Sequence, residues 1–498
     1  MVSSSIVSGD HQSTGAGITS PVSRRMPRRR ALLALRRPLP NRARRRALAR
    51  PRSCDTSPRP ANVGGAVTES RVTHPAASAR GGSARDPAMD LVRVLCVVLV
   101  VAGHLLMIGA TIVPGRGLVV ERTLLETQWI GPLTWIAQIM PLFFVVGGFA
   151  GLGAWRRLEA SGGTASDYIR SRILRLARPS IALFTALAIG ILAMHLTGVD
   201  PVSIRLIGLG ISAPLWFLAA YAFAQAYLPG LATFHARAPW WTLATLAAGA
   251  LACDILRFAT GFEALALLDM TFVWLFAQQL GFWIADGWFA RRSPATVAAI
   301  GAGAYLVLFG LVGLGYPGNM LDNLWPPTFA IVALAVGQTC LLVLAHPALT
   351  KLVSVRWVRV VVAVVGARLM TVYLWHVPVL ALVIGLLLLT PLPAPAAGSP
   401  AWWLTRPAVL VVMVVVLAGI SAVLGRLERP SPAPRQRPSD WATGLASACM
   451  VLPPFAVLVW GLYFLVAACS ALLLAGAVLL LNPLPARARE RDPSAVTP

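Results

Sequence analysis

Long apolar runs recur along this chain from residue 91 to residue 481, and they constrain its fold more than any other feature of the sequence. A helix needs about 20 apolar residues to cross the roughly 30 Å hydrocarbon core of a bilayer. With 57% hydrophobic and 12% charged residues, the chain is too apolar for an ordinary soluble domain. It is predicted to be an all-α protein, a polytopic bundle of transmembrane helices. Ten core spans are expected, at residues 90–113, 131–154, 179–197, 211–232, 240–258, 269–288, 296–315, 327–346, 369–390 and 405–425.

A further apolar block, residues 443–482, follows an expected cytoplasmic linker at 426–442. The block is long enough for one tilted helix or for two tight ones, and no polar turn divides it. Pro453 and Pro454 interrupt it, and the basic residues of the tail at 483–498 favour a C-terminus in the cytoplasm. Two additional helices satisfy both observations, so two are expected.

The charges of the loops predict how the helices are oriented, because Lys and Arg collect on the cytoplasmic side of membrane proteins. Basic residues are frequent before the first span and after every second span, whereas the alternate loops hold few or balance them with acids. We therefore expect a multi-pass protein of the cell membrane with its N-terminus in the cytoplasm. The basic residues after even-numbered spans include Arg156, Arg157, Arg170, Arg172, Arg175, Arg178, Arg237, Arg291, Arg292, Lys351, Arg356, Arg359 and Arg426.

Residues 1–85 are rich in Arg, Ser, Pro, Gly and Ala without a periodic apolar pattern, so a disordered basic extension is expected. The alternatives are a transit-like or nucleic-acid-binding arm and an over-long gene start, with Met89 as the initiator. This region holds 17 of the 43 Lys and Arg residues that give the chain its net charge of +24. Since a basic tail and loop charges beside apolar helices set membrane topology, no nucleic-acid partner is expected.

One polar stretch lies within the first span, where Asp90, Arg93 and His104 are set among apolar residues. Arg93 and His104 are eleven positions apart, which brings them to within about 20° of one helix face, with His104 roughly 16 Å deeper. Asp90 and Arg93, three positions apart, can pair. Ionisable groups inside a membrane usually face a bundle interior or a wet cavity, so the stripe is a candidate functional site. The alternative is that His104 only packs against a neighbouring helix.

Five segments resemble those of the acyltransferase 3 family, in the family's order. Asp90-Leu-Val-Arg93, followed by Val-Val-Leu-Val-Val-Ala-Gly-His104, resembles the signature of the first helix. Members of this family are integral membrane enzymes that move acyl groups onto hydroxyls of sugars and related acceptors. The resemblance implies a ten-helix membrane domain over residues 86–425. The other four segments are 140–149 (MPLFFVVGGF, with Gly-Gly where many members have Ser-Gly), 168–179 (YIRSRILRLARP), 214–218 (PLWFL) and 373–378 (YLWHVP).

The resemblance implies transfer of an acetyl or other short acyl group from a cytoplasmic acyl-CoA such as acetyl-CoA. The implied acceptor is a hydroxyl of a sugar, glycan, glycolipid or glycosylated small molecule. His104 is the expected general base, since an imidazole with an ordinary pKa of about 6.5 suits proton removal from a hydroxyl. Arg93 is expected to clamp a donor phosphate or to steady the oxyanion, and Asp90 to orient Arg93. Direct transfer and a transient acyl-histidine both fit, and neither a metal nor a permanently bound cofactor is expected.

Four further residues are candidate substrate contacts. Arg172 and Arg175 lie on a segment whose apolar positions suggest a short interfacial helix, and their guanidinium forks suit the phosphates of acyl-CoA. Contact with anionic membrane lipid is the alternative. Trp216 and His376 lie in two of the resembling segments and are candidates for binding substrate, although tryptophans at such positions are more often interfacial anchors.

A transporter or flippase of a polar or lipid-linked solute is the competing hypothesis. It would also use a buried His and Arg among ten or more helices. Such transporters usually carry inverted repeats with interrupted helices at matching positions, and no such pairing is visible in this sequence. The acyltransferase hypothesis is therefore preferred.

Overall fold

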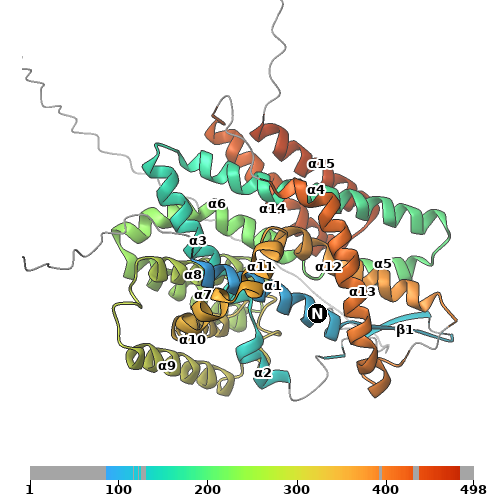
Figure 1. Cartoon of the computed structure of the whole chain (residues 1–498), viewed down its shortest axis with the longest axis horizontal. Helices are drawn as coiled ribbons and strands as arrows, with labels where there is room; N and C mark the ends of the chain where they lie inside the picture. The colour runs from blue at the N-terminus through green and yellow to red at the C-terminus, as the bar shows by residue number, and fades with distance from the viewer. Residues whose placement is uncertain are drawn as a thin grey trace, which may run out of the picture. The chain divides into compact units, whose positions relative to one another are not determined.

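The computed structural model describes residues 86–115, 117–121, 123–124, 130–391, 395–429 and 437–482, so the extension at 1–85 and the tail at 483–498 lie outside the described residues. The described residues form α-helices, two 3₁₀-helices (η1, Glu263–Leu265, and η2, Gly425–Glu428) and one hairpin of β1 (Gly109–Val113) and β2 (Gly117–Glu121) (Figure 1). The α-helices are α1 (Pro87–Met107), α2 (Ile130–Ala137), α3 (Met140–Ala160), α4 (Ala165–Leu196), α5 (Pro201–Ser212), α6 (Trp216–Arg237), α7 (Pro239–Thr260), α8 (Ala266–Ala285), α9 (Pro294–Gly313), α10 (Phe329–Ser354), α11 (Arg356–Gly366), α12 (Leu369–Leu388), α13 (Pro400–Leu424), α14 (Asp440–Trp460) and α15 (Phe464–Leu481).

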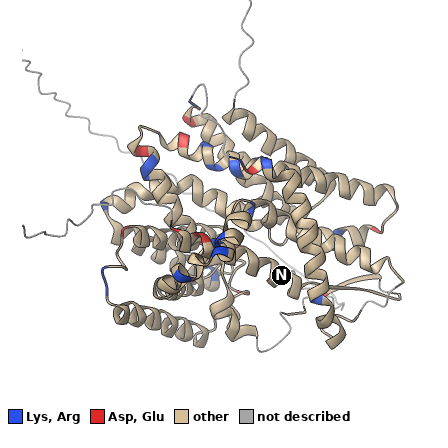
Figure 2. Cartoon of the chain, viewed as in Figure 1, with Lys and Arg blue, Asp and Glu red and all other residues tan. Residues whose placement is uncertain are grey.

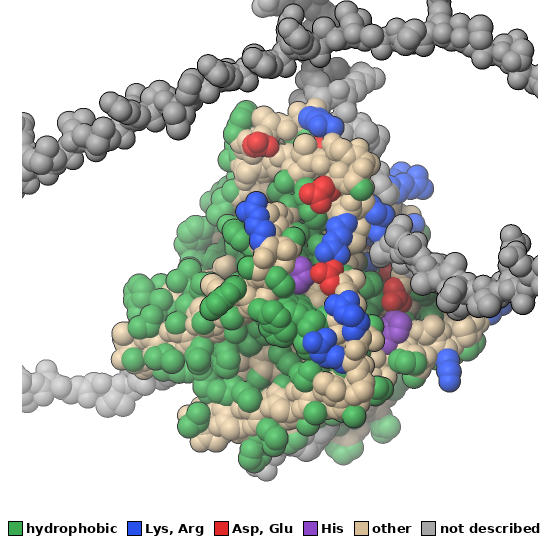
Figure 3. Space-filling model, turned by 90° about the vertical axis from the view of Figure 1, so that its left-hand side faces the viewer, with side chains coloured by type: hydrophobic (Ala, Val, Ile, Leu, Met, Phe, Trp, Pro, Cys, Tyr) green, Lys and Arg blue, Asp and Glu red, His purple; other side chains and the backbone are tan. Residues whose placement is uncertain are grey.

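Twelve segments of the described residues are helical, long and apolar enough to cross a membrane. This confirms the expected bundle of ten core helices with two more at the C-terminal end. The chain is accordingly a multi-pass membrane protein. Charged side chains occupy few positions along the helices (Figure 2). Figure 3 shows the face that lies on the left-hand side of Figure 1, where charged side chains form a band beside a largely hydrophobic surface.

The C-terminal block divides at a glycine, which corrects the expected interruption at the proline pair. Pro453 and Pro454 lie inside α14, and the chain turns at Gly461, where φ is +86°. Glycine populates positive φ without the steric cost that a Cβ brings. The following helix, α15, packs along α4, where Nε of Arg170 donates a 2.9 Å hydrogen bond to the carbonyl oxygen of Leu481. Arg170 therefore binds the C-terminal end of α15 and joins the added block to the core.

The first predicted span, 90–113, ends earlier than expected, because residues 109–113 form a strand. The two strands pair antiparallel in a register that runs from Gly109 opposite Glu121 to Val113 opposite Gly117. β-Branched residues such as Thr, Ile and Val favour a strand over a helix. Gly115 and Gly117 adopt positive φ at the turn, so the chain reverses directly after β1.

Two other predicted spans, 131–154 and 211–232, are each divided. The first becomes α2 and α3, with Pro141 in the first turn of α3, and the second becomes α5 and α6, with Pro214 between them. Proline has no N–H to continue a helix and disfavours helical geometry in the residue before it. The short interfacial helix expected around Arg172 is instead the first part of the continuous helix α4.

Helices α3 and α8 approach with their backbones in contact. A Cβ built on Gly148 would lie 2.1 Å from the carbonyl oxygen of Gln278, and one built on Gly281 would lie 2.0 Å from that of Val145. Small residues allow this close approach, which membrane bundles use because lipid provides no hydrophobic drive for helix association. The tight α3–α8 pair stands beside α6, one of the helices that form the site described next.

Candidate active site

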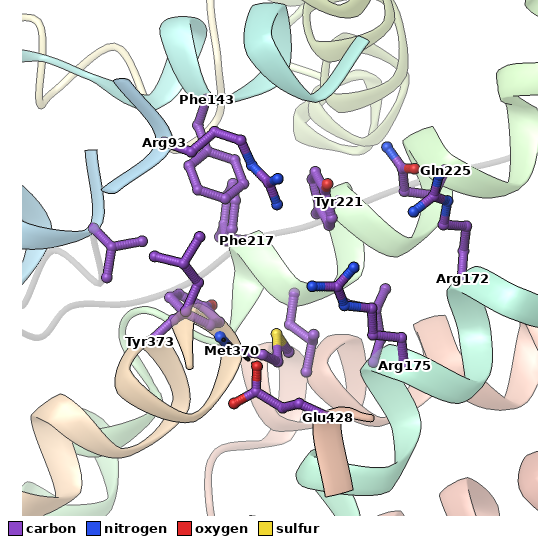
Figure 4. A pocket seen from close by; sticks show the side chains of 14 residues that line it. Arg93, Phe143, Arg172, Arg175, Phe217, Tyr221, Gln225, Met370, Tyr373 and Glu428 are labelled. Atoms are coloured by element: carbon purple, nitrogen blue, oxygen red, sulfur yellow. Dashed lines mark hydrogen bonds between the residues drawn. The ribbon is translucent and has the colours of Figure 1, made fainter. Parts of the chain in front are cut away.

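A cavity of about 70 Å³ lies between α1, α4, α6 and α12, and three predicted site residues line it (Figure 4). Arg93 reaches it from α1, and Arg172 and Arg175 reach it from α4, where their spacing of three puts them on one helix face. We call this cavity the arginine pocket. Its other lining residues are Val97, Phe143, Leu176, Phe217, Leu218, Tyr221, Gln225, Leu369, Met370, Tyr373 and Glu428.

The arginine pocket is cationic. Arg93 lies 3.8 Å from the carboxylate of Asp90, in the pairing that their spacing predicted. The guanidinium of Arg172 lies 4.8 Å from the centre of the Tyr168 ring, and its buried Nε has no hydrogen-bond partner among the described residues. Arg93 and Arg175 extend their guanidinium groups into the pocket from different helices (Figure 4). Guanidinium forks converging in this way suit an anion with several oxygens, such as a phosphate.

Glu428, the acidic residue that lines the pocket, binds the start of α12. Its carboxylate accepts hydrogen bonds from the backbone N–H groups of Thr371 (2.8 Å) and Met370 (3.4 Å) and from the Thr371 hydroxyl. The first N–H groups of a helix have no partner within the helix, and these two belong to the first turn of α12. Glu428 therefore caps the helix that carries His376, and it is one carboxylate beside three arginines in the lining of the pocket.

His104 and His376 meet on the facing sides of α1 and α12. Nε2 of His376 lies 3.3 Å from Nδ1 of His104, and the two rings are arranged edge to face with centroids 4.9 Å apart. His376 is fully buried, whereas His104 is half-buried. The residue that the sequence placed among the substrate contacts thus touches the residue expected to act as the base.

Backbone carbonyls define the protonation of both rings. Nδ1 of His104 lies 2.9 Å from the carbonyl oxygen of Val100, and Nδ1 of His376 lies 2.6 Å from that of Tyr373. A carbonyl oxygen only accepts, so each Nδ1 carries a hydrogen and each Nε2 of the neutral ring carries a lone pair. The Nδ1–H of His104 is therefore shared between Val100 and the lone pair of His376. The Nε2 of His104 keeps its lone pair available for a proton.

The start of α1 is fixed by a contact to α10. One carboxylate oxygen of Asp86 accepts from the N–H groups of Ala88 (2.9 Å) and Met89 (3.4 Å), and the other lies 2.9 Å from Nε2 of His346. Asp86 is thus the N-cap of α1, with Pro87 in the first turn, a combination typical of helix starts. The contact sets the position of the helix that presents Arg93 and His104.

Sequence comparison identifies the family of the domain that holds these residues. Residues 86–425 match the acyltransferase domain of the acyltransferase 3 family. The chain belongs to this family. It is accordingly a membrane acyltransferase, and the suspected family is confirmed. Neither a curated protein nor a solved structure gives a significant match to the chain.

Four predicted site residues of this acyltransferase do not line the arginine pocket: Asp90, His104, His376 and Trp216. Trp216 begins α6 and packs against other aromatic rings, with its centroid 5.6 Å from Trp274 and 6.4 Å from Trp325. The next residue, Phe217, lines the pocket. The structure thus brings the three arginines together and pairs the two histidines, whereas the contact of Trp216 with a substrate stays a prediction.

Four polar residues that line the arginine pocket of this acyltransferase were not among the predicted site residues. Tyr373 opens the YLWHVP segment, and its hydroxyl donates a 2.6 Å hydrogen bond to the carbonyl oxygen of Pro214, which joins two family segments. Tyr221 and Gln225 follow the PLWFL segment at helical spacing. Glu428 lies beyond the family match, and no motif points to it. Within the described residues, no three His, Cys, Asp or Glu side chains are grouped to hold a metal ion.

Proposed function

We propose that this acyltransferase moves a short acyl group from acyl-CoA to a hydroxyl of a sugar-containing acceptor. The observation that carries the proposal is that Arg93, Arg172 and Arg175 line one pocket. Arg93 lies on α1, and the same helix carries His104 eleven residues later. Coenzyme A carries several phosphates, for which arginine forks provide bidentate contacts. Sugar as the acceptor rests on the family resemblance alone.

The donor enters from the cytoplasm in this proposal. The loop charges favour an N-terminus on that side, and the Arg93 half of α1 is the half that follows the N-terminus. The arginine pocket then faces the compartment that contains acyl-CoA, at a cell membrane that the chain crosses several times. The acyl-CoA is a substrate, and no permanently bound cofactor takes part.

In the proposed reaction, Nε2 of His104 removes the proton of the acceptor hydroxyl while the hydroxyl oxygen attacks the thioester carbonyl carbon. The carbonyl π electrons move to its oxygen, and the tetrahedral intermediate then collapses as the C–S bond breaks. The departing CoA thiolate takes the proton from the His104 imidazolium, which restores the neutral base. The products are an ester and CoA thiol, so protons and electrons balance.

Arg93, Asp90 and His376 support this step in different ways. Arg93 clamps a donor phosphate or steadies the oxyanion, and Asp90, 3.8 Å away, orients the guanidinium. His376 accepts the Nδ1–H of His104 and so favours the tautomer whose Nε2 is the base. The last role makes His376 a positioning residue rather than a direct substrate contact.

A labelling experiment tests the proposal. Membranes that contain the full chain are incubated with [¹⁴C]acetyl-CoA or [¹⁴C]butyryl-CoA and a panel of sugars and glycolipids, alongside His104→Ala. Label should reach an acceptor with the native chain and fall to background with the variant. Label transfer that survives the substitution would remove His104 from the mechanism. Uptake of an unmodified solute without ester formation would support the transporter hypothesis instead.

A further inference from the structure

A second cavity, of about 90 Å³, lies between the end of α1, the β1–β2 hairpin, α5 and α12. Among the described residues, its lining consists of aliphatic residues and glycines, without a polar or charged side chain. We call it the apolar pocket. The hairpin and α5 lie on the right-hand side of Figure 1. A single water needs only about 10–15 Å³ of such space, so the apolar pocket is large enough for several carbon atoms.

The two histidines lie between the arginine pocket and the apolar pocket. On α12, Tyr373 lines the arginine pocket, His376 follows, and Val377 lines the apolar pocket. On α1, Val97 lines the arginine pocket, and the N–H of Ile108, which lines the apolar pocket, donates a 3.1 Å hydrogen bond to the carbonyl oxygen of His104. Both helices therefore present the same order: cationic pocket, imidazole, apolar pocket.

Acyl-CoA has its parts in a matching order: the phosphates of the adenosine end, then the pantetheine arm, the thioester at its sulfur and finally the acyl chain. In the proposed complex, the donor phosphates bind Arg93 and Arg175, and the thioester carbonyl lies within reach of His104. The acyl chain then extends from the thioester away from the arginines. We infer that the apolar pocket receives the acyl chain of the donor, and that this donor carries a chain of several carbons. The inference rests on the proposed function and adds chain-length selectivity to it.

Burial of methylene groups gives the expected size of the effect. Each buried methylene strengthens binding by about fourfold, from the transfer free energy of a methylene from water to an apolar site. Affinity should therefore rise from acetyl-CoA to butyryl-CoA to hexanoyl-CoA until the pocket is full. Unacylated CoA contacts only the arginine side and should be insensitive to changes in the apolar pocket.

Two glycines allow the pocket to be filled without disturbing the helices. Gly385 on α12 and Gly210 on α5 both line it, and a Cβ on either would meet no atom within 4 Å. Gly385→Leu and Gly210→Leu therefore place side chains in the cavity from two different elements. Gly419→Leu on α13 is the matched control, because Gly419 is exposed, also has open space around its Cβ and does not line the pocket.

The experiment measures equilibrium binding of CoA, acetyl-CoA, butyryl-CoA and hexanoyl-CoA to the full chain in phosphatidylcholine nanodiscs. We expect affinity to rise with chain length in the native chain and in Gly419→Leu. The rise should disappear in Gly385→Leu and Gly210→Leu, while CoA itself binds all four proteins equally, which also shows that the variants are folded.

Two results would overturn the inference while leaving the proposed function intact. One is CoA binding whose affinity does not change with acyl length, as expected if membrane lipid fills the pocket. The other is a chain-length dependence that both glycine variants retain, as expected if an alkyl chain of the acceptor occupies the pocket. Failure of the native chain to bind CoA at all would instead remove the proposed function.

Discussion

His235 and His104 both lie inside the bundle, and they differ in their partners. Nε2 of His235 lies 3.0 Å from one carboxylate oxygen of Asp286, whose other oxygen accepts a 2.6 Å hydrogen bond from Arg156. Gln279 contacts the second nitrogen of the His235 ring. His104 bonds a backbone carbonyl and another imidazole, and within the described part of the chain no carboxylate lies at ion-pair distance from it.

This difference separates a structural histidine from the proposed catalytic base. Both nitrogens of His235 are engaged by side chains of other elements, so the ring ties α6 to α8, and Arg156 extends the contact to α3. His104 uses Nδ1 for its local contacts, and its Nε2 is the proposed base. The same residue type thus serves packing where a carboxylate and an amide surround it, and can serve proton transfer where one nitrogen stays available.

The largest expected effect comes from removing each ring in turn. His104→Ala should lower acyl transfer by about 10²–10⁴-fold with little change in thermal stability, because the ring acts on substrate. His235→Ala should lower the free energy of unfolding by about 1–3 kcal/mol, because it leaves buried polar partners unsatisfied, and keep activity per folded molecule. Transfer assays and thermal unfolding of both variants measure the two effects. Equal losses of stability in the two variants would remove the distinction.

A smaller effect is expected at His376. His376→Ala should lower kcat about tenfold without raising KM for the donor, because His104 loses the acceptor that favours its reactive tautomer. His376→Gln offers an amide oxygen to the same Nδ1–H and should recover part of the loss. Steady-state kinetics of both variants against donor concentration test this role. A rise in KM with unchanged kcat would make His376 a binding residue instead.

Two arginines differ in the same way as the two histidines. Arg156 is paired with a carboxylate, whereas Arg175 faces the arginine pocket. Arg175→Gln should raise KM for acyl-CoA about tenfold with kcat nearly unchanged, because a charge-assisted phosphate contact is lost in ground state and transition state alike. Arg178→Ala, on the same helix and not among the lining residues, is the control for general lipid contact. Equal KM values for the two variants would favour the lipid-contact alternative.

The smallest expected effect is the pH dependence of the structural cluster. Burial raises the pKa of Asp286, but the hydrogen bonds and charges of Arg156 and His235 outweigh it, so the pKa lies below the ordinary carboxyl value. The carboxylate then stabilises the fold above about pH 3.9, the ordinary value, and this stabilisation is lost as pH falls through the lowered pKa. Asp286→Asn should therefore be less stable than the native chain at pH 7, and the difference should shrink below about pH 4. Thermal unfolding at both pH values measures it, and a constant difference would contradict the assignment.

Much of the site was predictable because its members lie on single helices. The spacing of Asp90, Arg93 and His104 gave their common face, and that of Arg172 and Arg175 gave theirs. The resemblance to the family added His376. The partnership of His376 with His104 was not predictable, because it depends on how α1 and α12 face each other across 272 positions of chain.

The sequence by itself determined the membrane bundle and its ten core spans, because hydropathy is a local property of the chain, and the order of five short motifs indicated the family. It could not determine where α1 gives way to a hairpin, that Glu428 caps α12, or that an apolar pocket follows the histidines. Those features were decided by the tertiary structure, because each depends on contacts between segments far apart in the sequence. The contrast between His104 and His235 is of the same kind, since no local pattern distinguishes a histidine that meets a carboxylate from one that does not.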